Sequence, residues 1–322
     1  MKASVIIPAF NAEKAIKQCL EALEKQTTGN FEVIVVDDGS TDKTPELAKK
    51  FRGIRLLQQK NSGPAAARNL GAKNAKGEII IFTDSDCIAE KNFLEEMLAP
   101  FADKKIAGVQ GKYKSRQKEL AARLTQLEIE QRHEKMAKQE SIDFMGSYAA
   151  AYRKKVFEEM KGFDTSYPMA SGEDTDLSFR ISKAGHKMVF SEKAVVWHTH
   201  PASFLKYLRI KFYRAFWRTK LYGKHKDKIV NDSYTSLMIK IQLAVSYFFI
   251  ASVIVAGFNS DALKFSAISI IVFFITTIPF AAWAFGRDKT IGIVFPGIAF
   301  CRTISFGIGL IAGTIRQVRN SI

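Results

Sequence analysis

Two aspartates one residue apart are the first side chains in this sequence whose spacing suggests chemistry. Residues 81–87 read IFTDSDC, an apolar run that ends in Asp84, Ser85 and Asp86. Carboxylates at positions i and i+2 after a strand can point in different directions. A divalent cation can be held by one or two such carboxylates while phosphate oxygens complete its shell. The alternative is a capped turn into a helix near Glu90, because Asp and Ser favour turns and caps.

A second acidic cluster lies at residues 172–180, which read GEDTDLSFR. Glu173, Asp174 and Asp176 crowd the start of a predicted helix, where the helix dipole stabilises negative charge. By itself this pattern would be a capping arrangement. Asp176 and Arg180 stand at i and i+4, which favours a structural ion pair between them. The remaining carboxylates are available for general base chemistry.

The first hundred residues alternate predicted strands and helices. Apolar β-branched runs predict the strands, and helical spacing after N-cap signals predicts the helices. We expect strands at Ser4–Pro8, Phe31–Ser40, Ile54–Leu57 and Glu78–Thr83, and helices after an Asn11 cap, from Thr44 and Pro45 to about Phe51, and over Pro64–Asn74. This order predicts a parallel, doubly wound sheet that binds ligands at the carboxyl ends of its strands. PAFN, DDGS and DSD each follow a strand, so all three should line one crevice.

Four motifs in this chain resemble the successive signatures of family-2 glycosyltransferases. They read VIIPAFNAEKAI, VIVVDDGSTDKT, NSGPAAARNLGAKNAKGEIIIFTDSD and GEDTDLSFRISKAG, and the match covers about residues 3–200. The resemblance implies the GT-A fold, a Rossmann-like α/β domain with a mostly parallel sheet. It also implies an enzyme that moves a sugar, with inversion, from a nucleotide-diphosphate donor to an acceptor.

The resemblance assigns roles to the carboxylates at the strand ends. In the family's D-x-D motif, Asp84 would bind the ribose side and Asp86 the metal, with Ser85 between them in the nucleotide-sugar site. Asp38 resembles the aspartate that accepts a hydrogen bond from the uracil or guanine edge. Asp37 is expected instead to hold the turn.

Three further residues are expected to line the nucleotide. Pro8 and Phe10 look like the family's wall beside the base, partly through backbone contacts. Arg68 would face the nucleotide, since a guanidinium suits phosphate or base oxygens. The alternative is that Arg68 is an ordinary surface arginine on a helix.

The same resemblance supplies a base and a metal ligand. Asp174 matches the general base that deprotonates the acceptor hydroxyl, and Glu173 is a neighbour on the acceptor side. His198 is the expected histidine ligand of the divalent ion, with His200 as the alternative. Oxygen ligands accept Mg²⁺ or Mn²⁺, and a histidine ligand favours Mn²⁺.

Net charge and cysteine spacing indicate the kind of partner and the cellular compartment. The net charge is +16, from 48 Lys and Arg against 32 Asp and Glu, which suits a polyanionic partner such as nucleic acid, anionic lipid or a phosphorylated substrate. Cys19, Cys87 and Cys301 are far apart, which argues against a disulfide framework and fits a reducing compartment. No signal-peptide core follows Lys2, so we expect the catalytic part to face the cytoplasm.

A basic and aromatic segment follows the last motif, over Ser203–Lys228. No DNA- or RNA-binding signature accompanies it, so a nucleic-acid partner is not expected. An amphipathic helix on an anionic membrane surface accounts better for interleaved cations and aromatic rings.

Three long apolar segments then predict membrane spans, at Leu237–Phe258, Ala262–Phe285 and Ile291–Ile315. The basic flank before residue 237 should face the cytoplasm. Three spans would leave Arg316 and Arg319 on the far side, so the third segment, broken by Pro296, is expected to be re-entrant or tightly packed. We expect Arg302, within that segment, to meet a lipid phosphate or to pack between helices.

The sequence thus predicts a GT-A domain over residues 1–202, a basic interfacial segment over 203–235, and a multi-pass membrane domain over 236–322. The expected enzyme passes one sugar from a UDP- or GDP-linked donor to a membrane-associated, lipid-linked acceptor. Processive polysaccharide synthases of this family usually carry Q-x-x-R-W, which is absent between residues 180 and 240.

Two other functions remain as alternatives. A nucleotidyltransferase would show a Gly-rich, Arg-containing loop after the first strand, and PAFNAEKAI has no glycine. A non-catalytic membrane scaffold is the alternative outside the enzymes, although every site carboxylate is present.

Overall fold

The computed structural model describes residues 2–229 and 236–321 and divides into two compact units. The sheet unit comprises Met1–Gln117 and Glu128–His200, and the helical unit comprises Lys118–Leu127 and Pro201–Ile322. Helix α5 (Leu120–Met136) therefore contributes its first turns to the helical unit. The sequence did not indicate this exchange, because α5 precedes the last two strands of the sheet unit.

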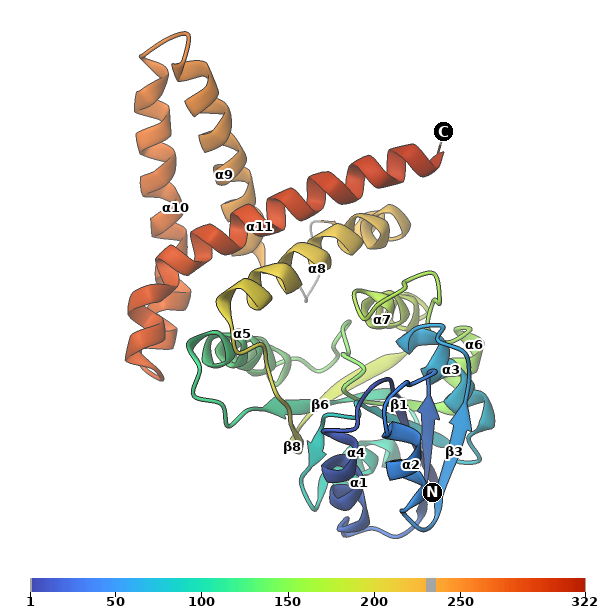
Figure 1. Cartoon of the computed structure of the whole chain (residues 1–322). Helices are drawn as coiled ribbons and strands as arrows, with labels where there is room; N and C mark the ends of the chain where they lie inside the picture. Colours follow the sequence, from blue (N-terminus) through green and yellow to red (C-terminus); the bar gives the residue numbers. More distant parts are fainter. Residues whose placement is uncertain (1, 230–235, 322) are drawn as a thin grey trace. The chain divides into compact units, whose positions relative to one another are not determined.

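The sheet unit is built on one mixed sheet of eight strands (Figure 1). Four strands are parallel neighbours in the order β3-β2-β1-β4, as the βαβ pattern predicts. Antiparallel β7 joins β4 to β6, which pairs in parallel with β8. The strands are β1 (Ala3–Ala9), β2 (Phe31–Asp37), β3 (Ile54–Gln58), β4 (Ile79–Thr83), β5 (Ile88–Ala89), β6 (Ile106–Lys114), β7 (Ala149–Arg153) and β8 (Lys187–Trp197).

Helices cover both faces of this sheet, which is why its central strands are apolar throughout. Successive residues of a strand point to opposite faces, so Val5 and Ile7 of β1 enter one core while Ile6 enters the other. The first core packs against α1 (Ile16–Glu24), α2 (Thr44–Lys49) and α4 (Phe93–Leu98). The second packs against α3 (Pro64–Asn74), α6 (Lys154–Glu159) and α7 (Glu173–Lys183).

Two predicted helix caps are wrong, and both residues hold strand-end loops together instead. Asn11 has φ 48° and its side-chain oxygen accepts from the Thr41 N–H at 2.9 Å, while Ala15 precedes α1. Thr44 is already inside α2, and its hydroxyl accepts from the Ala12 N–H at 2.7 Å. The loops after β1 and β2 are thereby fixed to one another beside the carboxyl edge of the sheet.

The helical unit contains α8 (Phe204–Lys224), η2 (Lys226–Lys228), α9 (Leu237–Ala256), α10 (Ala262–Phe285) and α11 (Lys289–Ser321). The last three are long and apolar enough to cross a membrane. Helices α9 and α10 run side by side as a hairpin (Figure 1). Helix α11 has 33 residues and is not broken at Pro296. It extends beyond the predicted segment, Ile291–Ile315, at both ends.

Helix α8 differs from these three because it is strongly cationic. Its 21 residues include three arginines and four lysines and no carboxylate. A cation at the centre of a bilayer costs about 2.5–3.5 kcal/mol on insertion scales, so seven of them exclude a membrane-spanning position. Ser203 caps this helix by accepting from the Lys206 N–H.

Candidate active site

A cleft of about 770 Å³ lies in the sheet unit where β1, β2 and β4 end. The turns PAFN, DDGS and DSD all contribute to it, as the parallel order of these strands requires. The residues predicted from sequence that line it are Pro8, Phe10, Asp38, Arg68, Asp84, Ser85, Asp86 and His198. Pro168, Met169 and Ala170, from the loop before α7, also line the cleft. Sequence reasoning missed this loop because it follows no strand.

The two aspartates at the end of β2 have different surroundings. Asp37 holds the turn, since its carboxylate accepts from the Ser40 N–H and from Gln58 Nε2, both at 3.1 Å. Asp38 lines the cleft but is only 4% exposed. Its carboxylate accepts from Gln59 Nε2 at 2.6 Å and from the N–H groups of Ser62 and Gly63, both at 2.9 Å. A carboxylate has about four acceptor positions, so one remains for a ligand.

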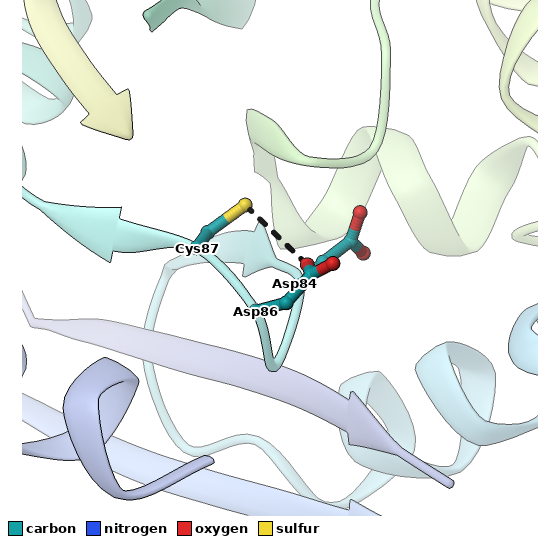
Figure 2. Close-up of side chains that lie close together, drawn as sticks. All are labelled: Asp84, Asp86 and Cys87. Atoms are coloured by element: carbon teal, nitrogen blue, oxygen red, sulfur yellow. Dashed lines mark hydrogen bonds between the residues drawn. The ribbon is translucent and has the colours of Figure 1, made fainter. Parts of the chain in front are cut away.

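Asp84, Asp86 and Cys87 bring their side chains together directly after β4 (Figure 2). Their ligand atoms lie within 4.8 Å of one another, and the side chain of Asp86 is 46% exposed. Burial raises the pKa of the Cys87 thiol well above its usual value, and a thiol suits a hard divalent cation less well than a carboxylate does. The two carboxylates therefore carry the metal-binding capacity of this turn.

His198 adds a nitrogen donor to that pair. Its Nε2 lies 3.2 Å from Asp86 Oδ2. Burial raises the pKa of Asp86, but the hydrogen bond and charge of His198 outweigh it and the pKa lies below its usual value. His200 is buried and lies beside His198, with 3.3 Å between the two Nδ1 atoms. Carboxylate oxygens with one imidazole fit Mn²⁺ or Mg²⁺.

Two tyrosine rings stack on the imidazole of His198. The Tyr113 ring lies on the His198 ring at 4.8 Å, and the Tyr148 ring lies on Tyr113 at 3.4 Å. No local pattern identifies Tyr113, because it reaches this position through the pairing of β6 with β8, where it faces Val196. The stack fixes the orientation of the imidazole beside Asp86.

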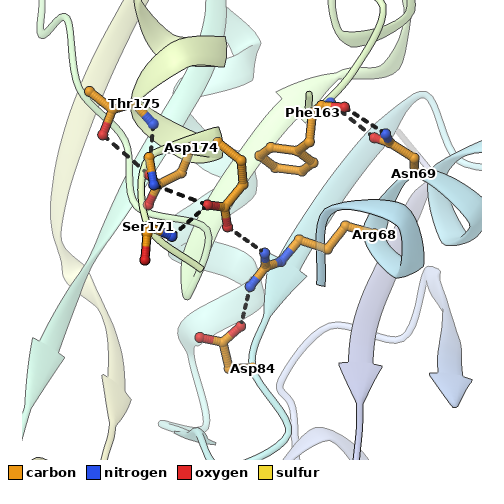
Figure 3. Close-up of polar contacts among 9 residues, drawn as sticks. Arg68, Asn69, Asp84, Phe163, Ser171, Asp174 and Thr175 are labelled. Atoms are coloured by element: carbon orange, nitrogen blue, oxygen red, sulfur yellow. Dashed lines mark hydrogen bonds and ion pairs between the residues drawn. The ribbon is translucent and has the colours of Figure 1, made fainter. Parts of the chain in front are cut away.

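Arg68 joins the turn after β4, which carries Asp84 and Asp86 and is called the donor-side turn below, to the start of α7 (Figure 3). Its guanidinium donates to Asp84 Oδ1 at 2.8 Å and to Glu173 Oε1 at 3.1 Å, and the residue is 2% exposed. It is therefore no ordinary surface arginine. Burial lowers the pKa of Arg68, but the two carboxylates outweigh it and raise the pKa above its usual value.

Glu173 is 1% exposed, and its carboxylate is bonded inside the protein. Besides Arg68, it accepts from the N–H groups of Ser171 and Gly172 at 2.9 and 3.1 Å. Burial and the neighbouring charge of Asp174 raise its pKa from 4.5 to about 7, against the opposing effect of Arg68. The Glu173 carboxylate is bonded to Arg68 and is not among the groups that line the cleft. The acceptor contact expected of Glu173 stays a prediction.

Asp174 lies in the first turn of α7 and is half-buried. Its Oδ1 accepts from the Thr175 N–H at 2.7 Å and from the Thr175 hydroxyl at 3.2 Å (Figure 3). The residue stands next to Glu173 but is not among those that line the cleft. The structural pair predicted beside it is confirmed, since Arg180 Nε donates to Asp176 Oδ2 at 2.9 Å.

Arg302 belongs to the helical unit, where its guanidinium donates to Gln242 Oε1 at 2.8 Å. It also lies over the Phe295 ring at 5.3 Å. Of the two predicted roles, packing between helices is the one for which the structure provides contacts.

Comparisons with known proteins give the family. The model of glycosyl transferase family 2 matches residues 4–161. The O-antigen chain rhamnosyltransferase RfbN of Salmonella typhimurium is 31% identical over 212 residues, which cover 62% of this chain and 67% of that protein. The chain belongs to glycosyltransferase family 2. The matched residues include the first three of the four sequence motifs and the strands that carry them.

Other curated relatives of this family-2 chain match over shorter stretches. Glycosyltransferase GlyG of Streptococcus pneumoniae is 41% identical over 115 residues, 34% of this chain and 38% of that protein. An uncharacterized glycosyltransferase of Rickettsia felis is 48% identical over 100 residues, 30% of this chain and 17% of that protein. The chain thus spans well under half the length of these two relatives.

Solved structures share the fold. Mannosyltransferase PcManGT from Pyrobaculum calidifontis, in complex with GDP-Man and Mn²⁺, has a TM-score of 0.66 at 19% identity, covering 100% of this chain and 88% of that chain. TarS residues 1–349 from S. aureus, in complex with UDP-GlcNAc, has a TM-score of 0.52 at 20% identity, covering 99% and 92%. The predicted GT-A-like α/β domain is confirmed.

Replacing Arg68 should destabilise the sheet unit. Arg68→Gln leaves Asp84 and Glu173 without their shared cation, and breaking a buried ion pair costs about 3 kcal/mol. The melting temperature of the detergent-solubilised protein checks this. Arg52→Gln, on an exposed arginine, is the matched control and should change stability by less than about 0.5 kcal/mol. Equal melting temperatures for the two variants would contradict the bridging role.

Glu173 should make stability depend on pH. Because its pKa is raised from 4.5 to about 7 on folding, its contribution is complete below pH 4.5 and is lost as the pH rises through 7. Glutamine cannot lose a proton. The melting temperature of Glu173→Gln minus that of the wild type should therefore rise between about pH 5 and about pH 8. A difference that stays constant or falls would show that Glu173 is ionised throughout.

Proposed function

We propose that this chain is a metal-dependent, inverting glycosyltransferase that passes one sugar from a nucleotide-diphosphate donor to a membrane-associated, lipid-linked acceptor. The observation that carries the proposal is the cleft, where Asp38, Asp84, Asp86 and His198 converge at the carboxyl ends of parallel strands. In this proposal Asp38 would bind the base, and Asp86 with His198 would bind the metal, all within one cleft.

The donor nucleotide would bind along the strand ends. Pro8 and Phe10 form a wall for the base, and Phe10 is 49% exposed, which leaves its ring available for stacking. Asp38 offers its remaining acceptor position to an N–H of the base. The relatives solved with ligands carry GDP-Man or UDP-GlcNAc, so UDP and GDP donors are both tested below.

The diphosphate would lie toward Asp84 and Asp86. Asp86 and His198 would hold the divalent cation, with the Asp84 carboxylate beside them. When bound, that cation neutralises the charge that develops on the departing nucleoside diphosphate. Asp84 already shares the Arg68 guanidinium, so its carboxylate is fixed in place before any donor arrives.

Asp174 would act as the general base. In the reaction the acceptor hydroxyl loses its proton to the Asp174 carboxylate as its oxygen bonds to the anomeric carbon. The bond from that carbon to the diphosphate oxygen breaks, and the nucleoside diphosphate leaves. Attack from the face opposite the leaving group inverts the anomeric configuration. Among the described residues, Thr175 donates to Oδ1 of Asp174, which leaves Oδ2 for the proton.

The acceptor is proposed to be lipid-linked because of the helical unit. Three long apolar helices of the helical unit suggest membrane anchoring. The cation-rich α8 precedes them, which by the positive-inside rule puts the sheet unit on the cytoplasmic side. The enzyme would then act on a substrate at the cytoplasmic face of the membrane.

Loss of the proposed base and of the proposed ligand should have different effects. Asp174→Asn should lower kcat by about 10²–10⁴-fold and leave the donor KM unchanged, because only proton transfer is lost. Asp86→Asn should raise the Mn²⁺ concentration needed for half-maximal activity. The assay follows labelled sugar from UDP- and GDP-sugars into extracted membrane lipid, with and without EDTA.

Asp103→Asn, at an exposed aspartate before β6, is the matched control and should behave as wild type. Wild-type kcat in Asp174→Asn would remove that residue from the mechanism. Full transfer in EDTA would contradict the metal requirement. No transfer by the wild type from any donor, with intact folding, would favour the scaffold.

A further inference from the structure

Helices α8 and α11 pack against each other in parallel through small residues. Ser305 Oγ donates to the Leu208 carbonyl at 2.9 Å. A Cβ atom added at Gly309 would lie 2.4 Å from the Phe212 carbonyl oxygen, and one at Gly313 would lie 2.3 Å from that of Phe216. These three contacts keep a constant offset of 97 residues. Small residues at spacing four let two helix backbones approach closely over several turns.

Because this contact runs along both helices, the second half of α11 lies at the same depth in a membrane as α8. Figure 1 shows the two ribbons side by side over this stretch. The seven cations of α8 keep that helix out of the hydrocarbon core. The second half of α11 is therefore held out of the core as well, although its apolar length alone would permit a span.

The first half of α11 reaches only part of the way along its neighbours. Phe295 packs on Phe280 of α10 at 4.2 Å, and Phe300 packs on Phe273 at 5.4 Å. Phe273 is halfway along α10, which runs from Ala262 to Phe285. Beyond this point α11 bonds to Tyr247 of α9 and to the Leu208 carbonyl of α8. The helix turns away from the hairpin instead of following it across.

The face of α11 opposite the small residues carries an apolar stripe. It recurs at alternating spacings of four and three residues and is exposed, with fractions between 38% and 55%, at Ile304, Ile308, Ile311, Ile315 and Val318. Arg316 follows Ile315 on the side of α11 that faces α8, where its guanidinium lies over the Trp217 ring at 4.5 Å. An apolar stripe beside cations and an indole ring is typical of a helix that lies in the membrane interface.

We infer that α8 and the second half of α11 form one in-plane helix pair seated on the anionic surface of a bilayer, with the isoleucine stripe dipping into the acyl chains. The occupant of the stripe is lipid, because α9 and α10 of the same unit also expose large apolar side chains, and Arg316 and Arg319 stand next to Ile315 and Val318, the last two residues of the stripe. The chain then crosses the bilayer twice, through α9 and α10, and its C-terminus returns to the side of the sheet unit.

This arrangement also removes the charge conflict that three spans would create. With α11 in the interface, Arg316 and Arg319 lie on the same side as the cations of α8, as the positive-inside tendency requires. The inference rests on helix packing and charge alone, and it holds whatever reaction the sheet unit performs.

Cysteine labelling of the full-length protein tests the topology. Cys19 and Cys87 are buried, so a Cys301→Ala background leaves no exposed thiol among the described residues. Single cysteines are introduced as Lys50→Cys in the sheet unit, Asn259→Cys between α9 and α10, and Asn320→Cys near the C-terminus. A membrane-impermeant maleimide is then added to right-side-out and to inverted vesicles.

We expect Asn320→Cys to label in the same vesicles as Lys50→Cys, and Asn259→Cys to label in the opposite ones. Labelling of Asn320→Cys together with Asn259→Cys would mean that α11 crosses the bilayer, and it would overturn the inference.

Depth measurements test the occupant of the stripe. Spin labels on Ile304→Cys and Ile315→Cys, in the same background, are read for collision with oxygen and with a polar nickel chelate in phosphatidylglycerol-containing vesicles. The inference predicts equal depth for both and access to oxygen. A spanning helix would separate them by about 16 Å in depth. Exclusion of both reagents would mean that a protein surface, such as a second copy of the chain, covers the stripe, and would contradict lipid.

Discussion

One buried guanidinium holds the proposed active site together. Arg68 comes from α3, yet its two partners come from the turn after β4 and from the first residue of α7. The Glu173 carboxylate is almost fully buried, and a charge there is far less costly with a bonded cation than without one, while the Asp84 carboxylate stays partly exposed at the cleft. The Arg68 bridge therefore fixes the distance between the donor-side turn and the helix that carries Asp174.

The sheet provides the second constraint. Parallel strands deliver their following turns to one edge, and Asn11 and Thr44 then tie two of those turns to each other. On the far side of the same edge, β8 ends at Trp197, so that His198 meets Asp86 directly after the strand. Donor-side groups from four separate segments thus reach one cleft through backbone pairing, with the aromatic stack on Tyr113 fixing the histidine.

The sequence predicted this architecture where local patterns determine it. Strand ends, the Ala-rich helix over Pro64–Asn74 and the acidic start of α7 were each visible as a local pattern, and their order implied the common edge. Tertiary contacts decided the rest. The burial of Arg68, the stack on His198 and the enclosed carboxylate of Glu173 depend on segments distant in sequence. Asn11 and Thr44 do not cap helices, and each side chain accepts instead from a backbone N–H of a neighbouring loop.

In the helical unit too, the sequence predicted the helices but not their packing. Hydropathy correctly marked three apolar helices but said nothing of what packs against the third, and the glycines of α11 acquire meaning only beside α8.

The most direct test of the account is the melting temperature of the purified protein with UDP or GDP, each with Mn²⁺ and with EDTA. A ligand at a hundred times its Kd stabilises the folded state by about 2.7 kcal/mol, which is readily measured. The account predicts a rise with one of the nucleotides in Mn²⁺ that disappears in EDTA. No rise with either nucleotide, or an equal rise in EDTA, would contradict a metal-dependent nucleotide site at Asp84, Asp86 and His198.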